Sequence, residues 1–246
     1  MIETDFTEDR ILGGKLVIRQ PIKGFRVSID TVLLASSVAA NNGERVFEPG
    51  AGHGGAALCL AQRLPDILIR GMEINSESVA LALENIKRNG FQKRIQITLG
   101  NVASKNAVCE EKPFQHVMIN PPYLEIAEAN IPPDVDKATA NFEGDTNLSL
   151  WIKCAYSALE SKGNLTLIYR TDHLDKLLQC LSKGFGNLIL IPLWPKEGEP
   201  AKRIIIKARK DVKTKLTLTP GLVLHQQDGK FTSTFEDILQ GAALSF

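Results

Sequence analysis

The sequence predicts an α/β protein whose mostly parallel sheet is covered by helices on both faces. From residue 45 onward, short runs of apolar and β-branched residues alternate with segments of helical periodicity. Two β-rich runs near residue 200 follow each other without a helix, which predicts an antiparallel hairpin at the end of the sheet. With 246 residues, 43% of them hydrophobic and 23% charged, the chain can bury one large core.

The first elements precede this alternation. Residues 11–18 predict a small hairpin, because two apolar runs flank a turn at Gly13 and Gly14. Residues 28–40 predict an amphipathic helix, for which Ser28 is a suitable N-cap. We therefore expect a hairpin and a helix before the sheet begins.

The central part of the chain alternates strand and helix. Strands are expected over residues 45–48, 67–73, 94–99, 115–119 and 164–170, and helices over residues 54–64, 76–89, 147–161 and 172–183. Ser76 is the expected N-cap of the second of these helices, and Gly90 marks its end. Strands over residues 187–193 and 202–209 then close the sheet, joined by a loop that contains Trp194 and Pro200.

The C-terminal part predicts a short strand over residues 221–226 and a helical turn over residues 235–239. The chain contains no internal repeat and no low-complexity linker. Because both terminal segments are too short to fold alone, we expect a single domain over residues 1–246. Its parts are an N-terminal extension (1–43), a core (44–210) and a C-terminal extension (211–246).

Cysteine usage and hydropathy predict a cytoplasmic protein without a metal site. The cysteines are scattered and form no Cys-x-x-Cys pair, as expected of buried thiols in a reducing compartment. No apolar stretch is long enough to cross a membrane, and residues 1–10 are too acidic for a signal peptide. A net charge of +1 means that any binding to nucleic acid depends on local basic patches.

A glycine-rich loop over residues 48–55 lies at a strand-to-helix turn, where glycines let the backbone approach a ligand closely. Its spacing fits two classes of enzyme. Gly50, Gly52 and Gly55 match the dinucleotide pattern Gly-x-Gly-x-x-Gly, and Glu73 stands at roughly the distance of 20 residues that this pattern expects of an acidic residue. Gly50, Gly52 and Gly54 match the Gly-x-Gly-x-Gly loop of S-adenosylmethionine enzymes. We expect His53 to shape this loop or to face solvent, and not to act as a catalytic base.

Acidic and amide residues near the loop help to choose between these classes. A carboxylate at Glu48 favours a cationic sulfonium over an anionic pyrophosphate. Glu73 ends the next strand, where its carboxylate can accept hydrogen bonds from both ribose hydroxyls or remain an exposed charge. Asn101 follows the third strand, where its amide oxygen can accept a hydrogen bond from the adenine amino group.

The segment Asn120-Pro121-Pro122-Tyr123 follows a buried strand and is the most informative motif of the chain. Two prolines end the strand in a stiff turn, at the sheet edge where ligands bind in open α/β sheets. The Asn120 amide oxygen and the Pro121 carbonyl can accept hydrogen bonds from an exocyclic amino group, and the Tyr123 ring can stack on a planar group. The alternative is a proline turn that caps the strand, with Tyr123 half-buried.

Together these residues resemble class I S-adenosylmethionine-dependent methyltransferases with an Asn-Pro-Pro-Tyr motif, in particular the bacterial valine-tRNA adenine-N6 methyltransferase-like family. The resemblance is carried by residues 9–16, 20–21, 24–30, the glycine loop, 120–123 and 221–225. It implies a Rossmann-like fold with a seven-stranded, mostly parallel sheet, and S-adenosylmethionine as the cofactor, with S-adenosylhomocysteine as its product.

The resemblance also implies roles for individual residues. Gln20 and Asp30 become candidate cofactor contacts, although Asp30 could instead be a charge at the start of a helix. Asn120 and Pro121 would bind the target amino group beside the cofactor, and Tyr123 would stack on the target ring. The implied reaction is methyl transfer to an exocyclic amino group, adenine N6 in tRNA being the first choice.

Several alternatives remain open. The same pocket could methylate a glutamine side chain of a protein, and the chain could also be a nicotinamide-dependent oxidoreductase or a non-catalytic nucleotide-binding protein. An acidic segment over residues 124–145 would repel RNA phosphates. Basic runs over residues 10–26 and 202–215 could bind an RNA backbone or be solvated surfaces, and Trp194 could stack on a base or pack as a hinge. The sequence predicts no oligomeric state.

Overall fold

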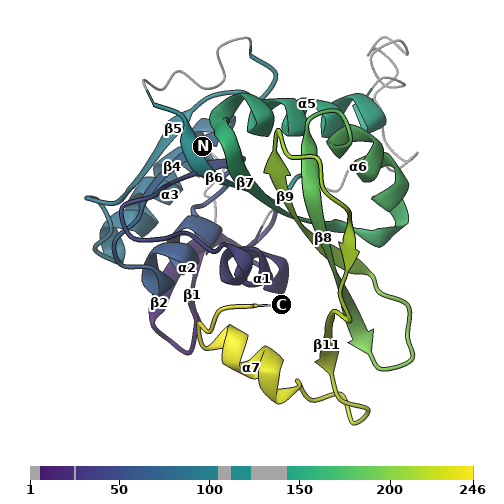
Figure 1. Cartoon of the computed structure of the whole chain (residues 1–246). Coiled ribbons are helices and arrows are strands. Elements are labelled where there is room, and N and C mark those ends of the chain that lie inside the picture. The colour runs from purple at the N-terminus through teal and green to yellow at the C-terminus, as the bar shows by residue number, and fades with distance from the viewer. Residues whose placement is uncertain (1–5, 25, 105–111, 123–142, 246) are drawn as a thin grey trace, which may run out of the picture.

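The computed structural model describes residues 6–24, 26–104, 112–122 and 143–245, and for residues 143–147 it describes the backbone alone. In this part of the chain a main sheet has the strand order β10-β8-β9-β7-β6-β3-β4-β5, with β11 also paired to β8 (Figure 1). Its strands are β3 (Arg45–Pro49), β4 (Leu68–Glu73), β5 (Ile95–Leu99), β6 (Phe114–Ile119), β7 (Leu159–Arg170), β8 (Phe185–Lys196), β9 (Arg203–Lys210), β10 (Thr217–Leu218) and β11 (Leu222–His225).

Strand directions confirm the mostly parallel sheet. Strands β5, β4, β3, β6 and β7 are parallel neighbours, whereas β9 runs antiparallel to both β7 and β8. The seven expected strands are all present. The short strands β10 and β11 add to the β8 edge, which brings the sheet to nine strands. Because β10 has only two residues, no sequence periodicity could have predicted it.

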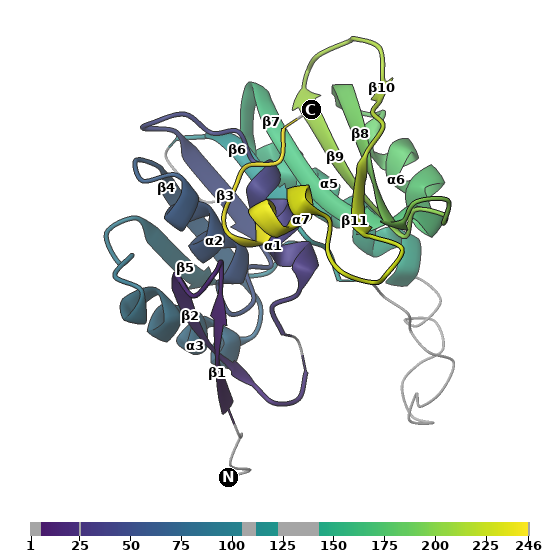
Figure 2. The same cartoon turned by 90° about the horizontal axis from the view of Figure 1, so that it is seen from below.

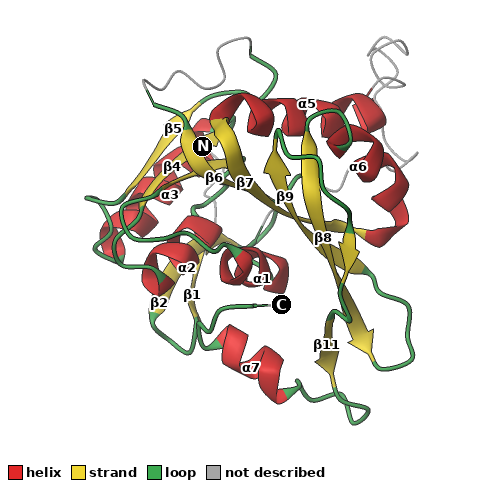
Figure 3. Cartoon of the chain, in the orientation of Figure 1, coloured by secondary structure: helices red, strands yellow, loops and turns green. Residues whose placement is uncertain are grey.

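Helices cover both faces of the sheet, as Figure 3 shows. The helices are α1 (Ile29–Ser37), α2 (Gly55–Arg63), α3 (Ser76–Arg88), α5 (Glu143–Ala158), α6 (Leu174–Leu181) and α7 (Ser233–Leu239), with a 3-10 turn η1 (Thr171–His173) before α6. One hydrophobic cluster joins one face of the sheet to α1, α2, α3 and α7, and a second joins the other face to α5 and α6. No helix in the described residues has the length and hydropathy needed to cross a membrane.

Three helix predictions need correction. The helix expected over residues 147–161 ends at residue 158, because residues 159–161 already belong to β7. Helix α1 was expected to be amphipathic, but residues 30–37 are all buried, because α2, β7 and α7 surround the helix. The N-cap of α3 is Asn75 and not Ser76, since the Asn75 side chain accepts a hydrogen bond from the Ser78 N–H at 2.9 Å. Gly90 follows the end of α3 with a positive φ of 76°, as expected of a residue that ends a helix.

The predicted N-terminal hairpin is present as β1 (Phe6–Ile11) and β2 (Leu16–Pro21). Its turn contains Gly13 and Gly14, both with positive φ. Alternate residues of β2 are buried, and the strand packs against α2 and α3 (Figure 2). The hairpin therefore lies beside the two helices that follow the first strands of the sheet.

Candidate cofactor and acceptor site

The candidate residues gather at one edge of the sheet because their strands are parallel. Glu48 is in β3, Glu73 ends β4, Asn101 follows β5 and Asn120 follows β6. Parallel neighbours bring these carboxyl ends to the same edge, which is where open α/β sheets bind ligands.

The glycine loop folds tightly over this edge. Gly50, Gly52 and Gly54 have φ values of +70°, +52° and +83°, a region that side chains disfavour. The N–H groups of Gly50 and Ala51 both donate to the Met72 carbonyl, at 2.7 and 3.0 Å. A Cβ atom on Gly50 would lie 2.3 Å from the ring of Trp151, so the loop and α5 are in close contact.

Glu48 is a buried carboxyl group beneath the loop. It accepts a hydrogen bond from the N–H of Ala57 in the first turn of α2. Among the described residues, no group forms a hydrogen bond with its Oε2 atom. Burial, with a smaller contribution from nearby Glu73, raises the pKa of Glu48 from 4.5 to about 8. A positive charge bound nearby would favour the carboxylate form.

Glu73 holds the loop to the end of β4. Its Oε2 accepts the Gly52 N–H and its Oε1 accepts the Asn75 N–H, each at 2.9 Å. The side chain is partly exposed, and each carboxylate oxygen has a second lone pair. Glu73 can therefore bind hydroxyl donors without releasing the loop.

Asn120 presents the second buried acceptor of this edge. Its Oδ1 is buried, and no described residue donates a hydrogen bond to it. Pro121 is buried and Pro122 is exposed, so the chain leaves the sheet at this point. Tyr123 and residues 124–142 of the acidic segment lie outside the described residues, as does Cys109, one of the scattered cysteines.

The three remaining candidate cofactor residues, Gln20, Asp30 and Asn101, each form hydrogen bonds with other residues of the protein. The Gln20 amide donates to Asp9 at 2.7 Å and accepts from the Val27 N–H at 2.9 Å. Asp30 accepts a hydrogen bond from the Arg203 Nε at 3.0 Å. The Asn101 side chain is exposed and accepts the Ala103 N–H at 2.8 Å, so it forms a local turn.

His53 is buried, so the alternative that it faces solvent is wrong. Burial lowers the pKa of its imidazole, although the nearby Glu73 carboxylate acts in the opposite direction. The His53 carbonyl accepts a hydrogen bond from Asn85 at 3.1 Å. His53 is therefore part of the loop's internal packing.

Sequence reasoning missed three residues near the site: Trp151 over Gly50, Arg203 beside Asp30, and Asn85 beneath His53. Asn85 lies in α3 and Asn89, four residues later, is the C-cap of that helix, so their amides lie about one helical turn apart and can both reach a neighbouring backbone. No local pattern marks the contacts of Trp151 or Arg203.

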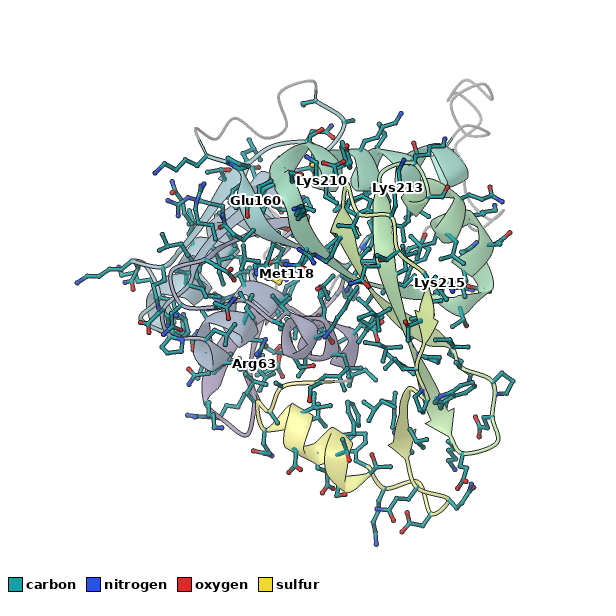
Figure 4. All side chains as sticks on the ribbon, in the orientation of Figure 1. Arg63, Met118, Glu160, Lys210, Lys213 and Lys215 are labelled. Carbon is teal, nitrogen blue, oxygen red and sulfur yellow. The ribbon has the colours of Figure 1, made fainter. Side chains whose placement is uncertain are left out.

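Neither of the two basic runs forms one continuous positively charged surface. Arg19 pairs with Glu84 and Arg26 with Asp9, so the run over residues 10–26 is partly neutralised. In the second run Lys202 precedes β9 at the glycine-loop edge, whereas Lys210 ends β9 at the opposite edge. Figure 4 shows Lys210, Lys213 and Lys215 following one another along the β9–β10 side of the molecule.

Trp194 was expected in the loop after the strand over residues 187–193, but it lies inside β8, where it pairs with Val223 of β11. Its indole N–H donates to the Pro220 carbonyl at 2.9 Å. A Cβ atom on Gly221 would lie 2.7 Å from the same indole nitrogen. The indole nitrogen is therefore packed against Pro220 and Gly221, which favours a structural role over a base-stacking platform.

The chemistry of this edge fits the cofactor that the resemblance implies. Glu48 offers a buried oxygen to a cationic group, and Glu73 offers acceptors to ribose hydroxyls. Asn120 offers a further acceptor to an amino group. The buried Glu48 carboxyl group disfavours the anionic pyrophosphate of a dinucleotide at this loop, whereas Glu73 suits a ribose in either class of enzyme.

Comparison with known proteins agrees with this chemistry. A family model described as the methyltransferase small domain matches residues 25–191, more than half of the chain. The tRNA1(Val) (adenine(37)-N6)-methyltransferase of Vibrio parahaemolyticus is 25% identical over 207 residues, 84% of each chain. The protein of the same name from Mannheimia succiniciproducens is 27% identical over 225 residues, 90% of this chain and 88% of its own.

Solved structures give the same fold. A protein from Agrobacterium tumefaciens described as a predicted O-methyltransferase has a TM-score of 0.73 and 28% identity, over 88% of this chain and 99% of that one. A methyltransferase from Pyrococcus furiosus has a TM-score of 0.56 at 18% identity, over 80% of this chain and 90% of that one, which is a likeness of fold alone.

Proposed function

The chain belongs to the methyltransferase small domain family and is an S-adenosylmethionine-dependent methyltransferase, and from this premise we propose that it methylates the N6 amino group of an adenine in tRNA. The family assignment removes the nicotinamide-dependent oxidoreductase alternative. The relatives named above act on adenine in tRNA by their names, which supports the same acceptor for this chain.

The buried Oδ1 of Asn120 is the observation that carries the proposal. No described residue donates to this buried amide oxygen, which is costly to leave without a hydrogen bond, and an exocyclic amino group would supply one. Asn120 lies at the same sheet edge as the glycine loop, because β6 and β3 are parallel neighbours. An amino group bound at Asn120 is thus presented toward the cofactor side of the site.

In this proposal the protein acts mainly by positioning. S-adenosylmethionine supplies an activated methyl group when it is bound. Glu48 and Glu73 hold the cofactor from one side, with Gly50, Gly52 and Gly54 allowing close approach. Asn120 Oδ1 and the Pro121 carbonyl accept hydrogen bonds from the target amine and orient its lone pair. A base in structured RNA must leave its stack to reach this edge.

Incorporation of label from S-adenosylmethionine tests the acceptor. The protein is incubated with labelled cofactor and total bacterial RNA, and the RNA is digested to nucleosides for mass spectrometry. We expect label in the tRNA fraction as N6-methyladenosine. Measurable cofactor binding without transfer into any RNA fraction would contradict the proposal.

A glutamine side chain is the second candidate acceptor, because its amide also presents an amino group to Asn120. Label that appears in protein and survives ribonuclease would favour this alternative. The nucleoside analysis also distinguishes methylation of an amino group from methylation of an oxygen atom. An oxygen acceptor is the one implied by the description of the Agrobacterium tumefaciens protein as a predicted O-methyltransferase. The single-domain organisation and a cytoplasmic location remain part of the proposal.

A further inference from the structure

The outer edge of β2 is closed by two asparagine side chains and not by another strand. Asn89 accepts the Val17 N–H at 3.0 Å and donates to the Val17 carbonyl at 2.7 Å. Asn85 accepts the Arg19 N–H at 2.8 Å and donates to the Arg19 carbonyl at 2.9 Å. Each amide thus replaces the peptide group of a missing neighbouring strand.

The spacing of the two asparagines explains why they fit this edge. Four residues advance about 6 Å along a helix. Two residues advance about 6.7 Å along a strand. Side chains one helical turn apart therefore reach alternate residues of the strand. A primary amide offers both a donor and an acceptor, as a peptide group does.

Only one of the two asparagines also contacts the glycine loop. The Asn85 amide is fully buried and donates a further hydrogen bond to the His53 carbonyl at 3.1 Å. The corresponding further bond of Asn89 goes to the Asn85 carbonyl of its own helix, at 2.8 Å. Asn85 therefore joins β2, α3 and the loop at one point.

The hairpin reaches the same region by a second route. The buried Gln20 amide accepts the Val27 N–H, which holds Val27 to the end of β2. Val27 packs on the start of α2, where a Cβ atom on Gly55 would lie 2.6 Å from its Cγ2. The position of the hairpin and the position of the loop are thus linked from both sides.

We propose that Asn85 is a positioning residue that couples the β1–β2 hairpin to the glycine loop, so that the hairpin contributes to cofactor affinity. The inference rests on the proposed cofactor site at the loop and not on the identity of the methyl acceptor. Without the Asn85 amide the His53 carbonyl loses its buried donor, and the loop gains conformations that do not bind. Cofactor affinity falls because only the ordered fraction of the loop is competent.

The matched variants Asn85→Ala and Asn89→Ala test the proposal. Both remove a two-bond contact with β2, so both should lower the melting temperature. Calorimetric titration with S-adenosylhomocysteine should show about fivefold weaker binding for Asn85→Ala, the equivalent of one neutral hydrogen bond. Asn89→Ala should bind within about twofold of the wild type. For Asn85→Ala the KM for S-adenosylmethionine should rise while kcat is unchanged.

Equal affinity in Asn85→Ala and Asn89→Ala would overturn the inference and leave the proposed function intact. Failure of the wild-type protein to bind S-adenosylhomocysteine would instead remove the cofactor site and this inference with it. If Asn85→Ala does not fold, amide hydrogen exchange of the wild-type protein, measured with and without S-adenosylhomocysteine, tests the coupling instead. Saturating S-adenosylhomocysteine should then slow exchange at Val17 and Arg19 more than in β11, and equal slowing would overturn the coupling.

Discussion

Asn120 is the residue on which the proposed chemistry depends most. Replacing Asn120 with alanine removes the acceptor for the target amine, while Glu48, Glu73 and the glycine loop remain. We expect transfer to fall by at least about a hundredfold, because a misplaced amine loses its alignment with the methyl group. Affinity for S-adenosylhomocysteine, measured by titration calorimetry, should be nearly unchanged.

The conservative variant Asn120→Asp separates this role from a structural one. A carboxylate oxygen can accept the same hydrogen bond, so activity should recover in part relative to Asn120→Ala. A merely structural role predicts that both variants lose melting temperature and activity together. Normal turnover by Asn120→Ala would remove Asn120 from the reaction.

Glu48 makes stability depend on pH. Its pKa in the folded protein is about 8, above the ordinary 4.5, so the folded state binds a proton that the unfolded state releases between these values. This stabilisation is complete below pH 4.5 and is lost as pH rises through about 8. The loss can reach about 1.4 kcal/mol per pH unit in that window.

Urea unfolding at several pH values, compared between the wild type and Glu48→Gln, measures this effect. Glutamine keeps an acceptor for the Ala57 N–H but cannot ionise. The free energy of unfolding of the Glu48→Gln variant should therefore fall less between pH 5 and pH 8 than that of the wild type. Curves that stay parallel over this range would show that Glu48 titrates normally.

Residues of the site differ in how far the sequence could predict them. Glu48, Glu73 and Asn120 were predicted because each follows or ends a short apolar run, and parallel strands bring such ends together. Trp151 was not, because its contact with Gly50 depends on how α5 crosses the sheet. Asn85 was missed for a similar reason, since its partners lie 66 and 32 residues away.

At the scale of elements, burial was harder to predict than element type. The apolar periodicity of residues 28–40 gave a helix correctly but could not show what covers its second side. That cover is α7 and the C-terminal segment, where the Leu244 N–H donates to the Ser36 carbonyl at 2.9 Å. Such contacts join segments about 200 residues apart, which local patterns do not encode.

The ion pair between Asp30 and Arg203 fixes α1 to β9. Its Nε–Oδ2 distance is 3.0 Å, and the Asp30 side chain is only 11% exposed. Arg203→Ala should lower the free energy of unfolding by about 1–3 kcal/mol, because a nearly buried carboxylate loses a charged donor. Urea denaturation measures the change.

A double-mutant cycle with Asp30→Asn gives the matched control. Asparagine removes the charge that needs compensation, so the double variant should be less destabilised than the sum of the single variants. Additive losses would mean that the pair contributes nothing to the docking of α1. A loss of S-adenosylhomocysteine affinity in Asp30→Asn, with no such loss in Arg203→Ala, would instead support Asp30 as a cofactor contact.

At the scale of the whole molecule, strand direction divides the basic run over residues 202–215. Lys202 lies before β9, two strands from Asn120 at the same sheet edge, which corresponds to roughly 10 Å across the sheet. Lys215 lies four strands from Asn120, roughly 19 Å across the sheet and displaced toward the opposite edge, because Thr217 of β10 pairs with Ile189 of β8 and through it is level with Lys207 of β9. A contiguous charge run in the sequence is therefore not one surface in the fold.

This division predicts different effects on RNA binding for two exposed lysines of the same run. Lys202→Glu should weaken binding of tRNA several-fold and lower the slope of log K against log salt by about 1, because it loses a phosphate contact at the acceptor edge. Lys215→Glu carries the same charge change and should stay within about twofold of the wild type. Filter binding at three salt concentrations measures both, and S-adenosylhomocysteine titration checks that each variant keeps its cofactor site. Equal weakening by both variants would show that the RNA extends to the opposite edge, and no weakening by Lys202→Glu would place the RNA path elsewhere.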